Sequence, residues 1–148
     1  MSRALALVSC TKSKLPTASP AAKLYSASHA VRLAYEFARR HADDIVILSA
    51  KYGAVRPRDE LAPYEETLKG VSRARKRKWA TATHVTLHRM SEYQKASNVL
   101  WLAGRDYYDE LLPLIERDGK RSELPLARMP QGKQRQWLQR KLAQSSSV

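Results

Sequence analysis

Side chains that could do chemistry gather first in the polar segment after the apolar run 4–8. Ser9, Cys10, Lys12 and Lys14 lie here. The segment lacks the glycines with which a phosphate-binding loop presents its backbone amides, so its side chains must make the contacts. A lysine whose pKa is lowered by burial is a nucleophile, whereas a lone cysteine is more often a packing residue. We therefore predict that Lys12 or Lys14 contacts a phosphate or acts as a nucleophile, and that Ser9, Cys10 and Lys12 are substrate contacts.

Two further polar segments follow the apolar runs 45–48 and 98–102. Tyr52 has a ring that could stack on a base, although packing under a loop would explain it equally well. Gly53 suits a turn with positive φ, and Asp106 either caps a helix or offers a catalytic carboxylate to a substrate. The substrate contacts predicted from these two segments are Ser49, Tyr52, Gly53, Gly104 and Arg105.

The long irregular stretch 50–70 is unusually acidic for this chain, since it contains Asp59, Glu60, Glu65 and Glu66. A loop of this length in a small domain is usually functional or disordered. A carboxylate held over the strand ends could act as a general base or stabilise a developing cation. Glu65 is the preferred catalytic candidate because it follows the Pro-Tyr pair that would anchor the loop. A solvated loop surface is the alternative.

The charge balance predicts a polyanionic partner. The chain of 148 residues contains 27 Lys and Arg against 14 Asp and Glu, which gives a formal net charge of +13. A cluster of cations on a small body provides phosphate contacts and a salt-dependent affinity, although any single lysine could be an ordinary solvated residue. The predicted contacts with a nucleic-acid backbone are Lys69, Arg73, Arg75, Lys76, Arg77, Lys78, Lys133 and Arg135.

Apolar runs and helical spacing alternate four times along the chain. Four buried strands are predicted at 4–8, 45–48, 98–102 and 124–126. Apolar residues spaced by three and four predict helices over about 28–41, 72–90, 106–115 and 131–142. Ser26 or Ser28 should cap the first and Ser72 the second, and Pro113 should kink the third or delay its start.

This alternation predicts an α/β fold, a three-layer α/β/α domain with a short, mostly parallel, four-stranded sheet. Ligands of such sheets bind at the carboxyl ends of the strands, so the three polar segments should converge there. The whole chain, 1–148, is expected to form one domain, with 143–148 as a frayed tail.

Several classes of protein are excluded or disfavoured. A single cysteine cannot form an intramolecular disulfide bond. No apolar stretch approaches the length of a membrane span, and the run 4–8 is too short for a signal peptide. We therefore expect a cytoplasmic monomer with no membrane partner. His84 and His88 have the spacing of metal ligands, but they lack the acid of an HExxH motif and any cysteine partner, so the pair predicts a helix face and no metal. No cofactor is expected.

The motifs LVSCTKSK, KLYSAS, ILSAKYGAVRP, LAPYEETL and LAGRDYYDELLP, taken together, resemble a small stand-alone bacterial and phage domain family. That family is related to the catalytic core of archaeosine synthase and to the uracil-DNA glycosylase-like α/β fold. In the archaeosine synthase core, a Cys and a Lys four residues later precede a Tyr-Ser-x-Ser run. Cys10 and Lys14 match this spacing, and Tyr25, Ser26 and Ser28 match the run, which implies that Tyr25 contacts the substrate.

The resemblance implies an enzyme that acts on a nucleobase. As a glycosylase of an anti-phage type, it would flip a modified base out of phage DNA and cleave the N-glycosidic bond. Lys14, Glu65 and Asp106 are the catalytic candidates. One alternative is a deazaguanine-modifying enzyme in which Lys14 attacks a nitrile on the base. Another is a non-catalytic nucleic-acid-binding module. RNA stays open as an alternative to DNA.

Overall fold

The centre of the molecule is a five-stranded sheet in the order β4-β3-β1-β6-β7. The computed structural model describes residues 3–9, 17–24 and 28–146. The central strand β1 pairs in parallel with β3 and β6, and β6 pairs in parallel with β7. The strands span Ala4–Ser9 (β1), Asp44–Ser49 (β3), Gly53–Val55 (β4), Asn98–Leu102 (β6) and Arg121–Glu123 (β7).

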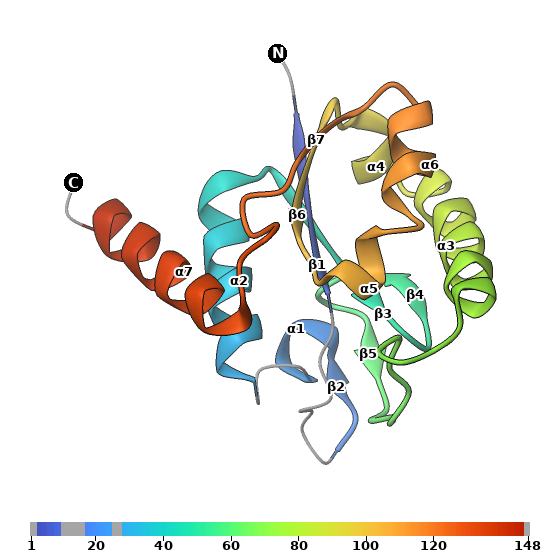
Figure 1. Cartoon of the computed structure of the whole chain (residues 1–148), viewed down its shortest axis with the longest axis horizontal. Coiled ribbons are helices and arrows are strands. Elements are labelled where there is room, and N and C mark those ends of the chain that lie inside the picture. The colour runs from blue at the N-terminus through green and yellow to red at the C-terminus, as the bar shows by residue number, and fades with distance from the viewer. Residues whose placement is uncertain (1–2, 10–16, 25–27, 147–148) are drawn as a thin grey trace.

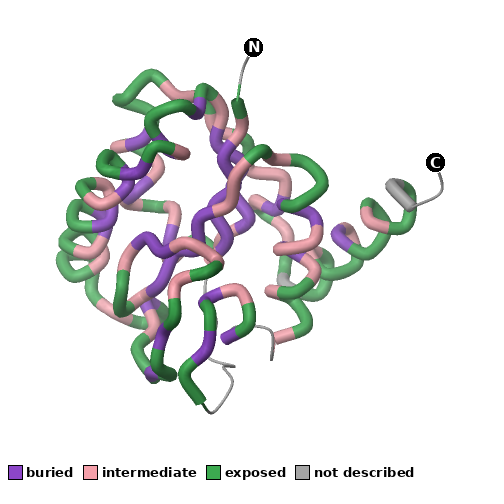
Figure 2. The backbone as a smooth tube through the Cα atoms, turned by 180° about the vertical axis from the view of Figure 1, so that it is seen from behind, coloured by how far each residue is buried: buried purple, intermediate pink, exposed green. Residues whose placement is uncertain are grey.

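Helices cover both faces of the sheet, so the predicted three layers are present (Figure 1). Helices α2 (His29–His41) and α7 (Gln131–Ser146) cover one face, and α3 (Arg73–His88), α4 (Ser91–Lys95) and α6 (Leu112–Arg117) cover the other. Alternate residues of β1 point to opposite faces of the sheet. Leu5 and Leu7 are part of the core beneath α3 and α6, and Ala6 and Val8 are part of the core beneath α2 and α7. In Figure 2 the buried segments run through the centre of the molecule and along one side of the helices, whose other side is exposed. A strand buried on both faces explains why the run 4–8 is apolar without alternation.

Two helix starts follow the predicted capping chemistry. The Ser28 side chain accepts a hydrogen bond from the Val31 amide at the start of α2. The Ser72 side chain accepts one from the Arg75 amide at the start of α3. Each hydroxyl satisfies a backbone donor that the first helical turn leaves without a partner.

The prediction of four strands is wrong, because the segment after β3 turns back and adds an antiparallel strand, β4. Gly53 has a φ of 76°, which lets the chain reverse, and Ala54 and Val55 are then buried against the sheet. The predicted strand at 124–126 is displaced, since β7 is formed by 121–123. A separate two-stranded pair joins β2 (Ser19–Pro20) to β5 (Glu60–Leu61), next to the short helix α1 (Ala21–Leu24).

The helical segments after β6 also differ from prediction. The expected helix over 106–115 is divided into α5 (Arg105–Tyr108) and α6, and Pro113 lies in the first turn of α6, where the missing amide of proline costs nothing. Asp106 is not a helix cap, because Gly104 has that position. Helix α7 continues to Ser146, through the first part of the segment predicted as a tail. Within the described residues, no helix has the length and apolar character needed to cross a membrane.

Candidate functional site

Two of the predicted polar segments meet at the carboxyl edge of the sheet. Ser9 ends β1, and Gly104 follows the end of the neighbouring strand β6. The Gly104 amide donates a hydrogen bond of 3.2 Å to the Ser9 hydroxyl. This contact joins the two strand ends, and α5 begins immediately beyond it. The edge therefore has the position at which parallel α/β sheets bind ligands.

A pocket of about 460 Å³ opens at this edge, and we call it the strand-end pocket. Its volume lies in the range of small-molecule sites. Its apolar walls come from β6, α2, α5 and α7, and include Val31, Leu102, Tyr107 and Leu138. The polar side chains that line it are Ser9, Ser28, Thr67, Lys69, Asp106, Gln134 and Arg135. Polar groups of several kinds thus converge on one apolar-walled space from segments far apart in the sequence.

Asp106 is the acid among the residues lining this pocket. Its Oδ1 accepts a 2.6 Å hydrogen bond from the Lys76 ammonium of α3. The Lys76 side chain is only 20% exposed, so this ion pair is partly shielded from water. Oδ2 makes no hydrogen bond to any residue in the described ranges. The pair fixes one oxygen of the carboxylate and leaves the other available to a ligand.

The residues after β3 form a packed cluster beside this edge. The Ser49 side chain is fully buried and lies 2.6 Å from the Tyr64 hydroxyl. The Ser49 hydroxyl also accepts a hydrogen bond from the Tyr52 amide, while its carbonyl accepts one from the Trp79 indole. Tyr52 packs edge-on against Tyr64, with 5.4 Å between ring centroids. Ser49, Tyr52 and Gly53, predicted as substrate contacts, are not among the residues that line the pocket.

The acidic loop approaches the pocket through different residues from those predicted. Tyr64 is buried and anchors the loop, as the Pro-Tyr pair indicated, and Leu68 is buried as well. Glu65 is exposed and does not line the strand-end pocket. Thr67 and Lys69, a few residues further on, do line it. The structure therefore brings Asp106 to the pocket and leaves Glu65 outside it.

Four of the predicted site residues, Cys10, Lys12, Lys14 and Tyr25, lie outside the described residues. Arg105 lies just beyond the strand-end pocket and lines the next hollow along the surface, where its guanidinium pairs with Asp109.

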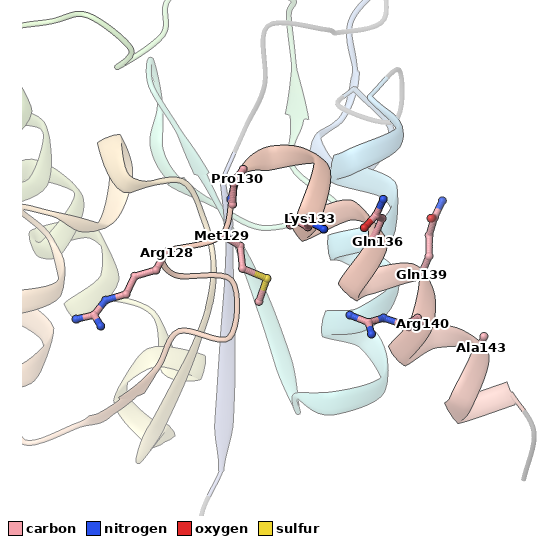
Figure 3. Close-up of a pocket in the computed structure, with 8 residues that line it drawn as sticks. All are labelled: Arg128, Met129, Pro130, Lys133, Gln136, Gln139, Arg140 and Ala143. Carbon is pink, nitrogen blue, oxygen red and sulfur yellow. The ribbon is translucent and has the colours of Figure 1, made fainter.

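Two further hollows continue from the strand-end pocket along the surface. One, of about 450 Å³, shares Gly104, Leu126 and Gln134 with that pocket. The other hollow, of about 730 Å³, shares Arg128 and Met129 with the 450 Å³ hollow and extends along α7. Figure 3 shows this last hollow, with Arg140 extending from α7 toward Met129. We call the three together the connected hollows.

The connected hollows are strongly cationic. The acids among their lining residues are Asp106 and Asp109. Both of these carboxylates already have a cationic partner, Lys76 and Arg105 respectively. The lining cations are Lys69, Arg105, Arg128, Lys133, Arg135 and Arg140. This excess of positive charge would attract a polyanion to the surface that leads into the pocket.

The predicted cations of α3 divide into two groups. Lys76 binds Asp106, while Arg73 and Arg77 each approach Glu110 to 3.6 Å. Arg75 and Lys78 are exposed and have no ion pair with a described residue. Part of the basic cluster therefore neutralises the protein's own acids, and the remainder is available to a partner.

Three of the groups with shifted pKa values, Glu92, Tyr93 and Lys120, are not among the residues that line the strand-end pocket. A hydrogen bond from Arg56 holds the pKa of Glu92 below its ordinary value, against the opposing effect of burial. Burial and its hydrogen bond to Asp118 raise the pKa of the Tyr93 hydroxyl. Burial lowers the pKa of Lys120, which lies over the Tyr93 ring.

Several residues of the site were not predicted from the sequence, and Thr67, Gln134 and Arg128 are examples. Thr67 and Gln134 line the strand-end pocket from a loop and from α7, and nothing in their local sequence distinguishes them. Arg128 joins two of the hollows and has a φ of 67°, a conformation uncommon for a residue other than glycine. Only the three-dimensional arrangement identifies these residues.

Comparison with known proteins places the chain by family. No curated protein and no solved structure matches it. One family model, described as a family of unknown function (DUF6884), matches residues 5–140. That match includes the strands of the central sheet and most of α7. It also includes every residue that lines the strand-end pocket. The chain therefore belongs to the DUF6884 family.

Proposed function

We propose that this protein is a DNA glycosylase-like enzyme, which receives a flipped, modified nucleotide in the strand-end pocket and cleaves its N-glycosidic bond. The observation that carries the proposal is the carboxylate of Asp106, which lines a partly apolar pocket at the end of a cation-lined surface. A base flipped from DNA needs such a space, with apolar walls for its faces and polar groups for its edges. The resemblance to the uracil-DNA glycosylase-like fold supports the same assignment.

The connected hollows would hold the DNA backbone. Lys69, Arg128, Lys133, Arg135 and Arg140 line them and form no ion pair with a described residue. Contacts between such side chains and phosphates supply affinity and orient the strand, without reading its sequence. The phosphates on either side of the flipped nucleotide would then lie beside Lys69 and Arg135 at the mouth of the pocket.

In the proposed reaction the bond between C1′ of the sugar and the base nitrogen breaks, and its electron pair leaves with the base. The cation that develops on the sugar is stabilised by the carboxylate of Asp106. Water then adds to C1′ and loses a proton to solvent, which leaves an abasic site. Lys76 acts as a positioning residue because it holds Oδ1 of Asp106. Ser9 and Thr67 offer hydroxyls to the edges of the base.

The test is incubation of the protein with a panel of DNAs that carry different modified bases. Mass spectrometry then identifies released free bases, and abasic sites are counted by strand cleavage in alkali. Asp106→Asn should lower the rate of base release by about 100-fold or more, since it removes the charge that stabilises the sugar cation. Glu116→Gln is the control, because Glu116 is an exposed carboxylate of α6 that lines none of the connected hollows; it should retain the wild-type rate.

Each other outcome assigns a different function. DNA binding without release of any base would refute the glycosylase and leave a nucleic-acid-binding module. A base that gains mass while its glycosidic bond stays intact, with activity lost in Lys14→Ala, would favour the deazaguanine type of modification. Release that is unaffected by Asp106→Asn but lost in Glu65→Gln would move the catalytic carboxylate to the acidic loop.

A further inference from the structure

A second cluster of ligand-like side chains lies at the other end of α3. His84 and His88 are one turn apart in the last part of this helix, and Asp118 caps the carboxyl end of the neighbouring helix α6. The Nε2 atoms of His84 and His88 lie 2.8 Å and 2.9 Å from Oδ2 of Asp118, and 3.2 Å from each other. The sequence showed the histidine pair but not its acidic partner, which is 30 residues away along the chain from His88.

The three atoms are arranged as ligands of one metal ion. The centre of the triangle that they form is about 1.7 Å from each atom, so an ion about 1.2 Å above its plane would be about 2.1 Å from all three. That is the distance that Zn²⁺ keeps to imidazole nitrogen and carboxylate oxygen. Two histidines and a carboxylate on one side of an ion also form a recognised ligand set for divalent first-row metals. The distances among the three atoms therefore match the radius of such a site.

The contact between the two imidazoles also favours an ion. Two Nε2 atoms that face each other at 3.2 Å cannot both direct a proton into the space between them. If both protons are on Nδ1, both Nε2 lone pairs point toward the same space, and a cation there satisfies them together with the carboxylate. The cluster is partly buried, with the His84 and Asp118 side chains about one-fifth exposed.

A second layer of contacts holds the carboxylate in place. The hydroxyl of the buried Tyr93 donates a hydrogen bond to Oδ2 of Asp118. The Lys120 ammonium lies 4.4 Å from the centre of the Tyr93 ring and donates a hydrogen bond to the Ala96 carbonyl. Supporting groups of this kind orient metal ligands and strengthen binding.

The cluster is separate from the proposed catalytic site. Asp118 lies just before β7, and the first residues of β7 and β6, Arg121 and Asn98, are paired. The cluster therefore lies near the amino ends of these strands, whereas the strand-end pocket lies beyond the carboxyl end of β6. An ion here would join the end of α3 to the turn between α6 and β7 (Figure 1).

We propose that His84, His88 and Asp118 bind one divalent transition-metal ion, such as Zn²⁺, which fastens α3 to the α6–β7 turn. The two imidazoles and the carboxylate supply three ligands, and water completes the coordination. This site does not depend on the proposed glycosylase activity, and either can fail without the other.

The experiment uses tag-free full-length protein that has been treated with a chelator and dialysed. Isothermal titration with ZnCl₂ should give one ion per chain, and thermal melting in ZnCl₂ should give a higher Tm than in the chelator. CoCl₂ should produce a visible absorption spectrum of the bound ion. His88→Ala, whose side chain is half exposed, should abolish saturable binding without changing the circular dichroism spectrum. Tyr93→Phe should weaken binding by about 10-fold.

His29→Ala is the matched control, because His29 lies on α2 and is not part of the cluster. It should bind Zn²⁺ as the wild type does. Absence of saturable binding in the wild type would overturn the proposal and leave a hydrogen-bonded His-Asp cluster. Binding that survives both His84→Ala and His88→Ala would overturn it as well, since the ion would then be held elsewhere.

Discussion

The charge of the connected hollows predicts how steeply DNA binding depends on salt. Lys69, Arg128, Lys133, Arg135 and Arg140 line them and form no ion pair with a described residue. If each neutralises one phosphate of duplex DNA, the slope of log K against log salt concentration is about −4.5. Affinity should then fall by about 500-fold between 50 and 200 mM salt, as follows from that slope. Fluorescence anisotropy of a labelled duplex at several salt concentrations measures this directly.

Removing two of these cations should change the slope by a defined amount. The double variant Arg128→Ala/Arg140→Ala should have a slope of about −2.7 and lose only about 40-fold in affinity over the same salt range. The matched control is Arg89→Ala/Lys95→Ala, because these exposed cations lie at the far end of α3 and on α4, outside the connected hollows. A wild-type slope shallower than about −1, or an equal change in both double variants, would refute the placement of DNA on this surface.

Three further predictions concern stability, measured as the free energy of unfolding in urea. Thr83→Val should raise it by about 1 kcal/mol, because the buried Thr83 hydroxyl has no hydrogen-bond partner among the described residues; a decrease would mean that the hydroxyl is satisfied. Leu111→Ala should lower it by about 2–5 kcal/mol, because Leu111 is fully buried, whereas Val85→Ala, at an exposed position, should change it by less than about 0.5 kcal/mol. Arg56 lowers the pKa of Glu92 in the folded protein, so the stability gained from this pair is complete above the ordinary carboxyl pKa and is lost as the pH falls through the folded value. The stability difference between wild type and Glu92→Gln should therefore shrink in acid, and a difference that stays constant would contradict the assigned cause.

The central part of the fold is predictable because its pattern is local and strong. The short, continuous apolar runs that became β1, β3 and β6 indicate strands buried on both faces. Ser28 and Ser72 mark helix starts through local hydrogen bonds. The hairpin to β4 was missed because it depends both on a local turn and on tertiary packing. Gly53 indicated a turn, but burial of Ala54 and Val55 depends on α3 lying above them. Such short strands have too few residues to show a period of two.

The candidate site was predicted only where topology decides position. Ser9, Gly104 and Asp106 meet because the carboxyl ends of β1 and β6 are neighbours in the sheet. The position of Glu65 depends instead on the course of an irregular loop, and the loop places Thr67 and Lys69 at the pocket. The partner of His84 and His88 was missed for a related reason. The packing of α6 on α3 brings Asp118 to them, and no sequence pattern near either histidine predicts this contact.

The distribution of charge connects the fold to the proposed function. A carboxylate beside a DNA backbone would repel the phosphates, and the structure offsets the charge of Asp106 with Lys76. Arg73 and Arg77 similarly face Glu110. Part of the charge of the basic helix α3 therefore neutralises the protein's own acids. Among the described residues, the cations of the connected hollows that have no acidic partner are Lys69, Arg128, Lys133, Arg135 and Arg140. A protein that only bound nucleic acid would gain affinity by replacing Asp106 with a neutral residue. The presence of an acid at this point, held by its own cation, is the reason we favour chemistry on a bound nucleotide over binding alone.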